Sequence, residues 1–211
     1  MGIFHAHPIG MEGAIMIIRP MEESDLDNCV AVVSGILGEP EDVTRDDIED
    51  YMEWDQDEAL LLIAESDEGA FLGFAALIVE SWNRTARIEW IGLLPEARGV
   101  GTGSALMQRL EFHAERMKVR KIYVNTGVSN RGAISFYLSR GFIPEAVFRD
   151  WYATGSDAVW LALDLSRSMG RGRKTGKSSG KSSGRPSSKS FNRSSGRANG
   201  RGGSGAGKSE S

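Results

Sequence analysis

Apolar residues follow two different spacings along residues 15–165. Near-continuous apolar runs of strand length occur at 59–64 (ALLLIA) and 85–94 (TARIEWIGLL), and such runs are typical of strands buried on both faces. Elsewhere apolar residues return every three or four positions, as at Leu106 and Leu110, which predicts helices with one buried face. The alternation of the two patterns predicts an α/β domain with about seven strands and about four helices.

The expected elements can be placed on the chain from these patterns and from the residues that end them. The expected strands cover 15–20, 59–66, 69–81, 85–94, 120–128, 142–152 and 157–165, and the expected helices cover 22–37, 44–54, 103–118 and 130–141. Ser24 and Thr44 are expected N-caps, since a hydroxyl can accept a hydrogen bond from a free N–H of the first turn. Gly141 is expected to end the last helix, because glycine adopts the left-handed conformation found after many helices.

The two ends of the chain differ from the domain in composition. From Ser166 onward the sequence is mostly Ser, Gly, Lys and Arg, with 12 basic residues and one acidic residue, Glu210. This segment has too few apolar residues to offset the entropy of folding, so residues 166–211 are predicted to be a disordered basic tail. Residues 1–14 are interpreted as a flexible extension, and residues 15–165 as one domain. The tail carries a net charge of +11 and the rest of the chain −15, an asymmetry typical of an interaction tail.

Composition argues against several classes of protein. No apolar run reaches the roughly 18–20 residues that a membrane helix needs, and no basic segment precedes an apolar one at the N-terminus, so neither a membrane partner nor a signal peptide is expected. Cys29 is the only cysteine, which rules out an internal disulfide and a thiolate metal cage. The three histidines are scattered, and no metal is expected. A lone cysteine fits a reducing compartment, so the expected location is cytoplasmic.

The stretch 95–106 (PEARGVGTGSAL) places Gly99, Gly101 and Gly103 directly before an expected helix. Glycine at this density costs stability unless the backbone must bend unusually or approach something closely, and the usual reason at a helix N-terminus is a phosphate. The spacing does not match the G-x-G-x-x-G fingerprint of dinucleotide-binding proteins. The tail sequence TGKSSGKSS looks like a P-loop but lacks its spacing and its flanking strand and helix.

The loop instead fits the pattern R-x-x-G-x-G through Arg98, Gly101 and Gly103, and a second motif follows at 129–142 (SNRGAISFYLSRGF). In these two motifs the chain resembles the GCN5-related N-acetyltransferase (GNAT) family, over about residues 15–165. The second motif has the family's usual residues at Asn130, Ala133, Tyr137, Gly141 and Phe142. The resemblance implies a GNAT fold with one mixed, mostly antiparallel sheet that is splayed between its fourth and fifth strands. It also implies an N-acetyltransferase that uses acetyl-coenzyme A as its co-substrate.

The resemblance assigns the co-substrate to a small set of residues. The loop is expected to hold the pyrophosphate through backbone N–H groups and the helix dipole. Its residues are Arg98, Gly99, Val100, Gly101, Thr102, Gly103 and Ser104. Backbone N–H groups near Leu93 are expected to bind pantetheine and to polarise the thioester carbonyl. Arg98 is expected to brace the loop or to approach phosphate, and Asn130 to cap its helix and to contact the co-substrate.

Two side chains are candidates for the proton transfers of acyl transfer. Glu89 is the lone carboxylate of the apolar run 85–94 and is the candidate general base. The alternative is that Glu89 is an ordinary strand residue that faces solvent. Tyr137 is the candidate general acid, because a phenol is protonated at neutral pH, with core packing as its alternative. The family also uses residues at these positions in catalysis.

The acceptor is less clearly indicated. Residues 39–58 hold eleven acidic residues and one basic residue, Arg45. In the family this region forms a wall of the acceptor site, and an acidic wall attracts cationic amines, although a solvated helix face would look the same. The C-terminal sequence around Trp151 and Tyr152 resembles that of ribosomal-protein N-terminal alanine acetyltransferases. Those enzymes have a catalytic glutamate where this chain has Asn125. This difference weakens the interpretation as an N-terminal acetyltransferase and favours Glu89 as the base, while small amines, polyamines and lysine side chains stay open.

Alternative functions stay open as well. The chain could be a non-catalytic sensor or adaptor that binds acetyl-coenzyme A, or an acyltransferase for a longer acyl group. The tail could bind RNA or the ribosome through its charge, and its five lysines could be acetylated by the chain's own domain. A homodimer is consistent with the resemblance.

Overall fold

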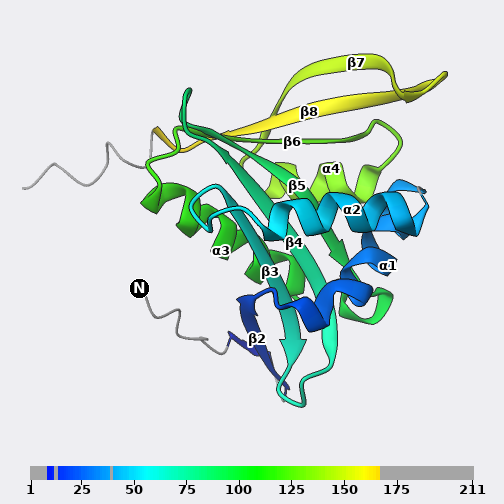
Figure 1. Cartoon of the computed structure of the whole chain (residues 1–211). Coiled ribbons are helices and arrows are strands. Elements are labelled where there is room, and N and C mark those ends of the chain that lie inside the picture. Colours follow the sequence, from blue (N-terminus) through cyan, green and yellow to red (C-terminus); the bar gives the residue numbers. More distant parts are fainter. Residues whose placement is uncertain (1–8, 12–13, 39, 167–211) are drawn as a thin grey trace, which may run out of the picture. The chain divides into compact units, whose positions relative to one another are not determined.

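The computed structural model describes residues 9–11, 14–38 and 40–166. The expectations for residues 1–8 and for the tail beyond residue 166 fall outside the described residues. The described part of the chain forms one mixed sheet of eight strands in the order β1-β2-β3-β4-β5-β6-β8-β7 (Figure 1). All neighbouring strands are antiparallel except β5 and β6, which are parallel. The mixed, mostly antiparallel sheet is therefore confirmed.

Seven of the eight strands agree with the expected ones, and all four expected helices are present. The strands are β1 (Ile9–Met11), β2 (Ala14–Pro20), β3 (Ala59–Ser66), β4 (Phe71–Glu80), β5 (Thr85–Leu93), β6 (Lys121–Gly127), β7 (Ile143–Ala153) and β8 (Ser156–Asp164). The helices are α1 (Leu26–Leu37), α2 (Glu41–Met52), α3 (Thr102–Arg116) and α4 (Arg131–Ser139), with short 3-10 turns η1 (Glu23–Asp25) and η2 (Pro95–Ala97). The strand that the sequence did not predict is β1, which pairs with β2 inside the expected N-terminal extension.

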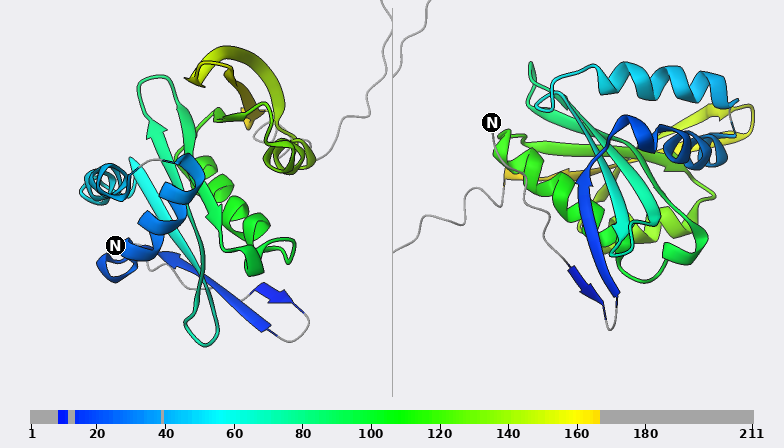
Figure 2. Two further views of the ribbon diagram at one scale, coloured as in Figure 1. Left: turned by 90° about the vertical axis from the view of Figure 1, so that its right-hand side faces the viewer. Right: turned by 60° about the horizontal axis from the view of Figure 1, so that its bottom comes forward.

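Helices cover both faces of the sheet, with α1 and α2 on one face and α3 and α4 on the other (Figure 2). Strand β3 shows why its sequence is almost continuously apolar. Leu60 and Leu62 belong to the core beneath α3 and α4, while Leu61 and Ile63 belong to the core beneath α1 and α2. Successive side chains of a strand point to opposite faces, so a strand between two helix layers is apolar at every position.

Both expected N-caps are wrong. Ser24 lies inside η1, whose N-cap is Glu22, and the Glu22 N–H donates to the Asp25 carboxylate at 2.9 Å. Asp25 is held in place by two hydrogen bonds from Arg19 of β2, at 2.6 and 2.8 Å. Thr44 lies inside α2, buried, because the helix begins earlier, after Pro40. Gly141, by contrast, follows α4 with a φ of 88° as expected.

The two parallel strands part soon after they meet. Strands β5 and β6 pair only at Thr85–Lys121, Ala86–Ile122 and Arg87–Tyr123. The remainder of β5, through Leu93, pairs with β4 alone. The splay expected between the fourth and fifth strands of the domain is therefore confirmed, and it leaves one edge of β5 without a strand partner.

Two glycines make a matched test of this packing. A methyl group on Gly73 of β4 would lie 2.6 Å from the backbone oxygen of Gly92 and 2.5 Å from Leu93 Cδ2, and a backbone oxygen inside a sheet cannot easily move aside. We expect Gly73→Ala to destabilise the protein by about 1–3 kcal/mol. Gly35 of α1 has no neighbour within 4 Å of such a methyl, so Gly35→Ala should stabilise the helix by about 0.5–1 kcal/mol. Urea unfolding of both variants measures the difference, and an equal stability for the two would contradict the close approach of β5 to Gly73.

Candidate active site

The glycine loop turns the chain from the end of β5 into α3. Gly99 and Gly101 have φ angles of 75° and 99°, a left-handed conformation that residues with a Cβ adopt only at a cost. Gly101 is the N-cap of α3, and its carbonyl accepts the first helical hydrogen bond from Ala105 at 3.0 Å. The loop glycines are therefore required by the backbone path itself.

The backbone N–H groups of this loop are left free. Among the described residues, no well-formed hydrogen bond donated by the N–H groups of residues 99–104 is found. The first N–H groups of any helix lack intrahelical partners, and here the two glycines before the helix add further donors. Neither Gly99 nor Gly101 has any atom within 4 Å of the position where a Cβ would be. A row of unpaired donors next to open space at the positive end of a helix suits an anion such as a pyrophosphate.

Leu93 lies beside this loop and is linked to it by Arg98. The Arg98 guanidinium donates two hydrogen bonds to the Leu93 carbonyl, from Nε at 3.2 Å and from Nη2 at 3.1 Å. A Cβ on Gly103 would lie 3.4 Å from Leu93 Cδ1, so the start of α3 packs against the end of β5. These hydrogen bonds tie the loop to the end of β5, and an approach of Arg98 to phosphate stays a prediction.

The free edge of β5 carries further donors. The Leu94 N–H donates to the Leu72 carbonyl at 3.1 Å, and hydrogen-bonded and non-hydrogen-bonded pairs alternate in an antiparallel ladder. The pairs Gly73–Leu93 and Ala75–Ile91 are therefore non-hydrogen-bonded, and the backbone groups of Leu93 and Ile91 point away from β4. They face the side from which β6 has diverged, where the Leu93 N–H is available to a ligand.

Glu89 occupies a β-bulge in β5. Ala76 pairs with Trp90 and Leu77 pairs with Ile88, so Glu89 is an extra residue with no partner on β4. The bulge puts its two neighbours on opposite faces: Ile88 belongs to the core beneath α3 and α4, and Trp90 to the core beneath α1 and α2. Bulges redirect side chains in this way. A strictly alternating pattern, as a regular strand requires, would have placed Ile88 and Trp90 on the same face.

The Glu89 carboxylate lies on the side of α2 and is mostly shielded from water. Its side chain is 17 % exposed and forms an ion pair with Arg87 of the same strand. Burial raises the pKa of Glu89 and Asp47 of α2 adds to the effect, while Arg87 acts in the opposite direction. Tyr51 of α2 belongs to the same group, since Glu89 raises its pKa and Arg87 lowers it, although burial is the largest cause of its raised pKa. A carboxylate with a raised pKa is a stronger base.

Tyr137 lies in the core of the opposite face. It is 3 % exposed and its ring packs against Phe136 and Phe142, with centroids 5.3 and 5.4 Å away. Burial raises the pKa of Tyr137, and Tyr152 of β7 adds to this. No hydrogen bond to its hydroxyl is found within the described residues. Both interpretations of Tyr137 therefore keep support, because the side chain is packed in the core and its phenol is protonated at neutral pH.

The structure brings together only part of the expected site. Leu93, Arg98 and Gly103 are in contact, and Phe136 lies 3.6 Å from the Cβ position of Gly103, so α4 joins them next to Tyr137. In the described residues, no hydrogen bond or ion pair connects Glu89 with Tyr137, which lie on opposite sides of the sheet. A reacting group between the two would have to occupy the region where β5 and β6 diverge.

Asn130 is the N-cap of α4, and its side-chain oxygen accepts a hydrogen bond from the Ala133 N–H at 3.1 Å. Its contact with the co-substrate stays a prediction.

Asn125 lies on β6 opposite Trp160 of β8, two positions beyond the last residue that pairs with β5. Sequence reasoning missed Arg87 and Tyr51, because nothing in the local pattern reveals a bulge or the helix that faces it.

The other reactive side chains have no evident role in this site. Cys29 is buried, and burial raises the pKa of its thiol to about 12, so it is protonated at neutral pH. His113 is buried on α3 with a pKa lowered by burial. Within the described ranges, no group of three His, Cys, Asp and Glu side chains is placed to hold a metal ion. No helix in this part of the chain is long and apolar enough to span a bilayer.

Comparison with known proteins gives a consistent picture. The model of the acetyltransferase (GNAT) family matches residues 31–142. An N-alpha-acetyltransferase of Sulfurisphaera tokodaii is 36% identical over 76 residues, which cover 36% of this chain and 46% of that protein. An uncharacterized N-acetyltransferase of Archaeoglobus fulgidus is 32% identical over 137 residues, which cover 59% of this chain and 91% of that protein. The chain thus spans less than half of the first relative and most of the second.

A solved structure has the same fold. The ribosomal-protein-alanine N-acetyltransferase from Brucella melitensis superposes with a TM-score of 0.59 and 20% sequence identity, covering 70% of this chain and 99% of that one. At this identity the likeness concerns the arrangement of helices and strands.

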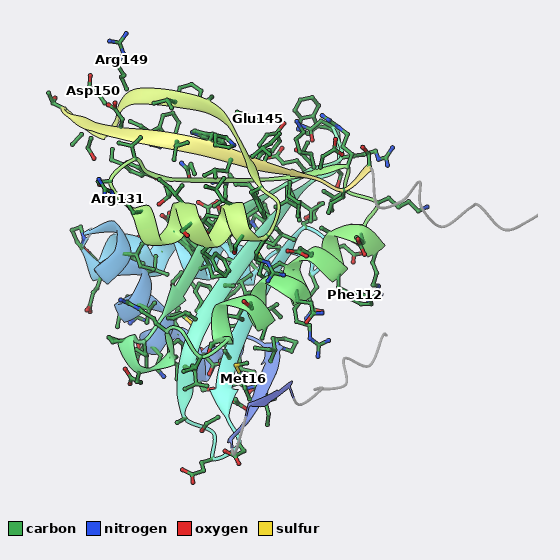
Figure 3. The ribbon with its side chains drawn as sticks, turned by 180° about the vertical axis from the view of Figure 1, so that it is seen from behind. Met16, Phe112, Arg131, Glu145, Arg149 and Asp150 are labelled. Atoms are coloured by element: carbon green, nitrogen blue, oxygen red, sulfur yellow. The ribbon has the colours of Figure 1, made fainter. Side chains whose placement is uncertain are left out.

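The glycine loop can be tested by comparing two left-handed glycines. Gly101→Ala should cost about 1–2 kcal/mol of stability through backbone strain and should also weaken binding of acetyl-coenzyme A at least tenfold by reorienting the free N–H groups. Gly155, in the turn between β7 and β8, has a φ of 78° and equally open surroundings. Its N–H donates to Asp150, which Figure 3 labels at the far end of that hairpin. Gly155→Ala should therefore cost similar stability and leave binding unchanged; calorimetric titration of both variants checks this, and equal losses of affinity would contradict the loop assignment.

Proposed function

The chain belongs to the acetyltransferase (GNAT) family, and on that basis we propose that it transfers the acetyl group of acetyl-coenzyme A to a primary amine of a cationic acceptor. The observation that carries the proposal is the row of unpaired backbone donors that runs from the open edge of β5 at Leu93 to the N-terminus of α3. These donors match the two polar regions of the co-substrate, its pyrophosphate and its amide-containing arm.

The donors divide the binding of acetyl-coenzyme A between two regions. The N–H groups of residues 99–104 would hold the pyrophosphate, with Arg98 keeping the loop against β5. The free edge at Ile91 and Leu93 would pair with the pantetheine arm as a neighbouring strand does. The Leu93 N–H would then donate to the thioester carbonyl oxygen, where negative charge develops during the reaction.

The acceptor must lose a proton for the reaction to proceed. A lysine-like amine has a pKa of about 10.4, so about one molecule in 2,500 is neutral at pH 7. Glu89 would accept the proton as the amine nitrogen attacks the carbonyl carbon, directly or through one water. The carbon–sulfur bond then breaks, and the departing thiolate takes a proton from the Tyr137 hydroxyl. The products are the acetylated amine and free coenzyme A.

The charge around Glu89 supports a cationic acceptor. Helix α2 carries most of the acidic segment 39–58, and the charge of Asp47 reaches Glu89 strongly enough to raise its pKa. Such a surface attracts ammonium groups from solution. Both a polyamine and a protein α-amine meet this description, and the Sulfurisphaera relative, named as an N-alpha-acetyltransferase, adds support for the second.

The decisive test is turnover of acetyl-coenzyme A by release of its thiol. The panel of acceptors contains spermidine, lysine, a peptide that begins with alanine, and the protein alone. We expect release with at least one amine, and a 10²–10⁴-fold lower kcat in Glu89→Gln, the range typical of a lost general base. Affinity for acetyl-coenzyme A should be unchanged in this variant, because Glu89 lies away from the loop. Release with the protein alone that is lost when the chain is truncated after Leu165 would identify the tail as the acceptor, and tight binding without any release would favour the sensor.

Removal of the Tyr137 hydroxyl should have a smaller effect. Burial raises the pKa of Tyr137, which makes the phenol a weaker acid, so water can partly replace it as the proton donor. We expect Tyr137→Phe to lower kcat about tenfold with an unchanged unfolding midpoint, since the ring contacts with Phe136 and Phe142 are kept. Comparison of kcat and thermal unfolding for the two proteins measures this. An unchanged kcat would leave Tyr137 as a core residue only.

A further inference from the structure

Arg87 lies two residues before the extra residue of the bulge, Glu89, in β5. Residues two positions apart in a regular strand point the same way, with their Cα atoms about 7 Å apart. The side chains of Arg87 and Glu89 meet and form an ion pair. This pair lies within one strand, at the last position where β5 still pairs with β6, since Arg87 is the register partner of Tyr123.

The ion pair distinguishes the two oxygens of the carboxylate. Oε2 of Glu89 is the atom in contact with Arg87 Nη1, and it is fully buried. Among the described residues, Oε2 has no hydrogen-bond partner, so its contact with Arg87 is an ion pair without hydrogen-bond geometry. The 17 % of the side chain that remains exposed therefore belongs to the rest of the group. Arg87 occupies one oxygen on the inner side, and the other is left for a proton from outside.

Tyr51 of α2 lies near the ion pair. Burial acts to lower the pKa of Arg87, but Glu89 and, after it, Tyr51 outweigh burial and raise that pKa. The Tyr51 ring is fixed between two tryptophans, with centroids 5.1 Å from Trp54 and 5.6 Å from Trp90. The charged groups that shift the pKa of Glu89 are thus Arg87 from its own strand and Asp47 from α2, and Glu89 in turn raises the pKa of Tyr51.

We propose that Arg87 is a positioning residue: its guanidinium holds Glu89 Oε2, so that the other carboxylate oxygen is presented to the acceptor amine. The inference rests on the proposed function, in which Glu89 is the base. Arginine suits this task because its planar group keeps a fixed geometry and stays charged at every accessible pH. A base that is free to rotate would spend part of its time turned away from the amine.

Arg87 also keeps Glu89 ionised. Burial disfavours the carboxylate, and the neighbouring guanidinium offsets part of that cost. Without Arg87 the pKa of Glu89 rises further, and more of the protein carries a protonated Glu89 that cannot accept a proton. The rate would then fall on the acidic side of the pH profile and recover as the pH rises.

The test compares pH profiles of kcat/KM for one accepted amine. Glu89→Gln first identifies the part of the profile that belongs to Glu89, as the acidic limb that disappears. In Arg87→Gln we expect the acidic limb to shift to higher pH by about one unit. We also expect a lower plateau of kcat/KM. Arg87→Lys restores the charge and should return the limb toward its original position, with part of the plateau still lost.

Lys121→Gln is the matched control. It removes an ion pair with Glu145 between β6 and β7, whose side chains are 21 % and 32 % exposed, and should leave the profile unchanged. Unfolding midpoints of all variants show whether the fold is kept. An unchanged acidic limb in Arg87→Gln, or a loss of plateau that Arg87→Lys does not reduce, would overturn the positioning role. If Glu89→Gln itself keeps full activity and its acidic limb, the proposed base is wrong, which is a separate outcome.

Discussion

The site depends on the early end of the pairing between β5 and β6. After three residue pairs the strands separate, and the backbone groups of Ile91 and Leu93 are left without a strand on that side. Unpaired backbone groups are costly when they are shielded from water. A fold keeps such an edge where a ligand can complete the ladder, and the glycine loop at the end of the same strand continues the row of donors. Sheet edge and helix N-terminus together form one extended surface for a chain-like molecule.

The bulge at Glu89 is held in place by the cores on both faces. A shift of one residue would move Ile88 and Trp90 to the wrong sides of the sheet, and each of these side chains is nearly fully buried in its own core. The position of Glu89 is therefore determined by its apolar neighbours. This explains how a charged residue in an apolar strand can be presented at a defined place: the packing energy of two large side chains fixes the backbone between them. Arg87 then fixes the orientation of the carboxylate.

Features set by residues close in sequence were predictable, and those set by distant contacts were not. The glycine loop, the cap at Asn130 and the left-handed Gly141 follow from short motifs, and the structure has them. Ser24 was a reasonable local N-cap, but Arg19 of β2 anchors Asp25, and that carboxylate caps the turn instead. The separation of β5 and β6 was expected from the family resemblance alone. The bulge at Glu89 depends on how β4 and the cores on both faces of the sheet pack around β5.

Two electrostatic effects act on the acceptor, and they operate over different ranges. The acidic side chains of α2 are mostly exposed, and salt screens exposed charges beyond about 8–10 Å at physiological ionic strength. Apart from Asp47, which raises the pKa of Glu89, these side chains therefore act on the approach of a cation from solution. The ion pair of Arg87 and Glu89 is half-buried and in direct contact, so it is screened much less and acts on the proton transfer itself. A guanidinium beside the base would repel an ammonium ion if it stood alone. The surrounding acidic helix offsets that repulsion, which allows the same region to attract a cationic amine and to keep a positive charge beside the group that deprotonates it.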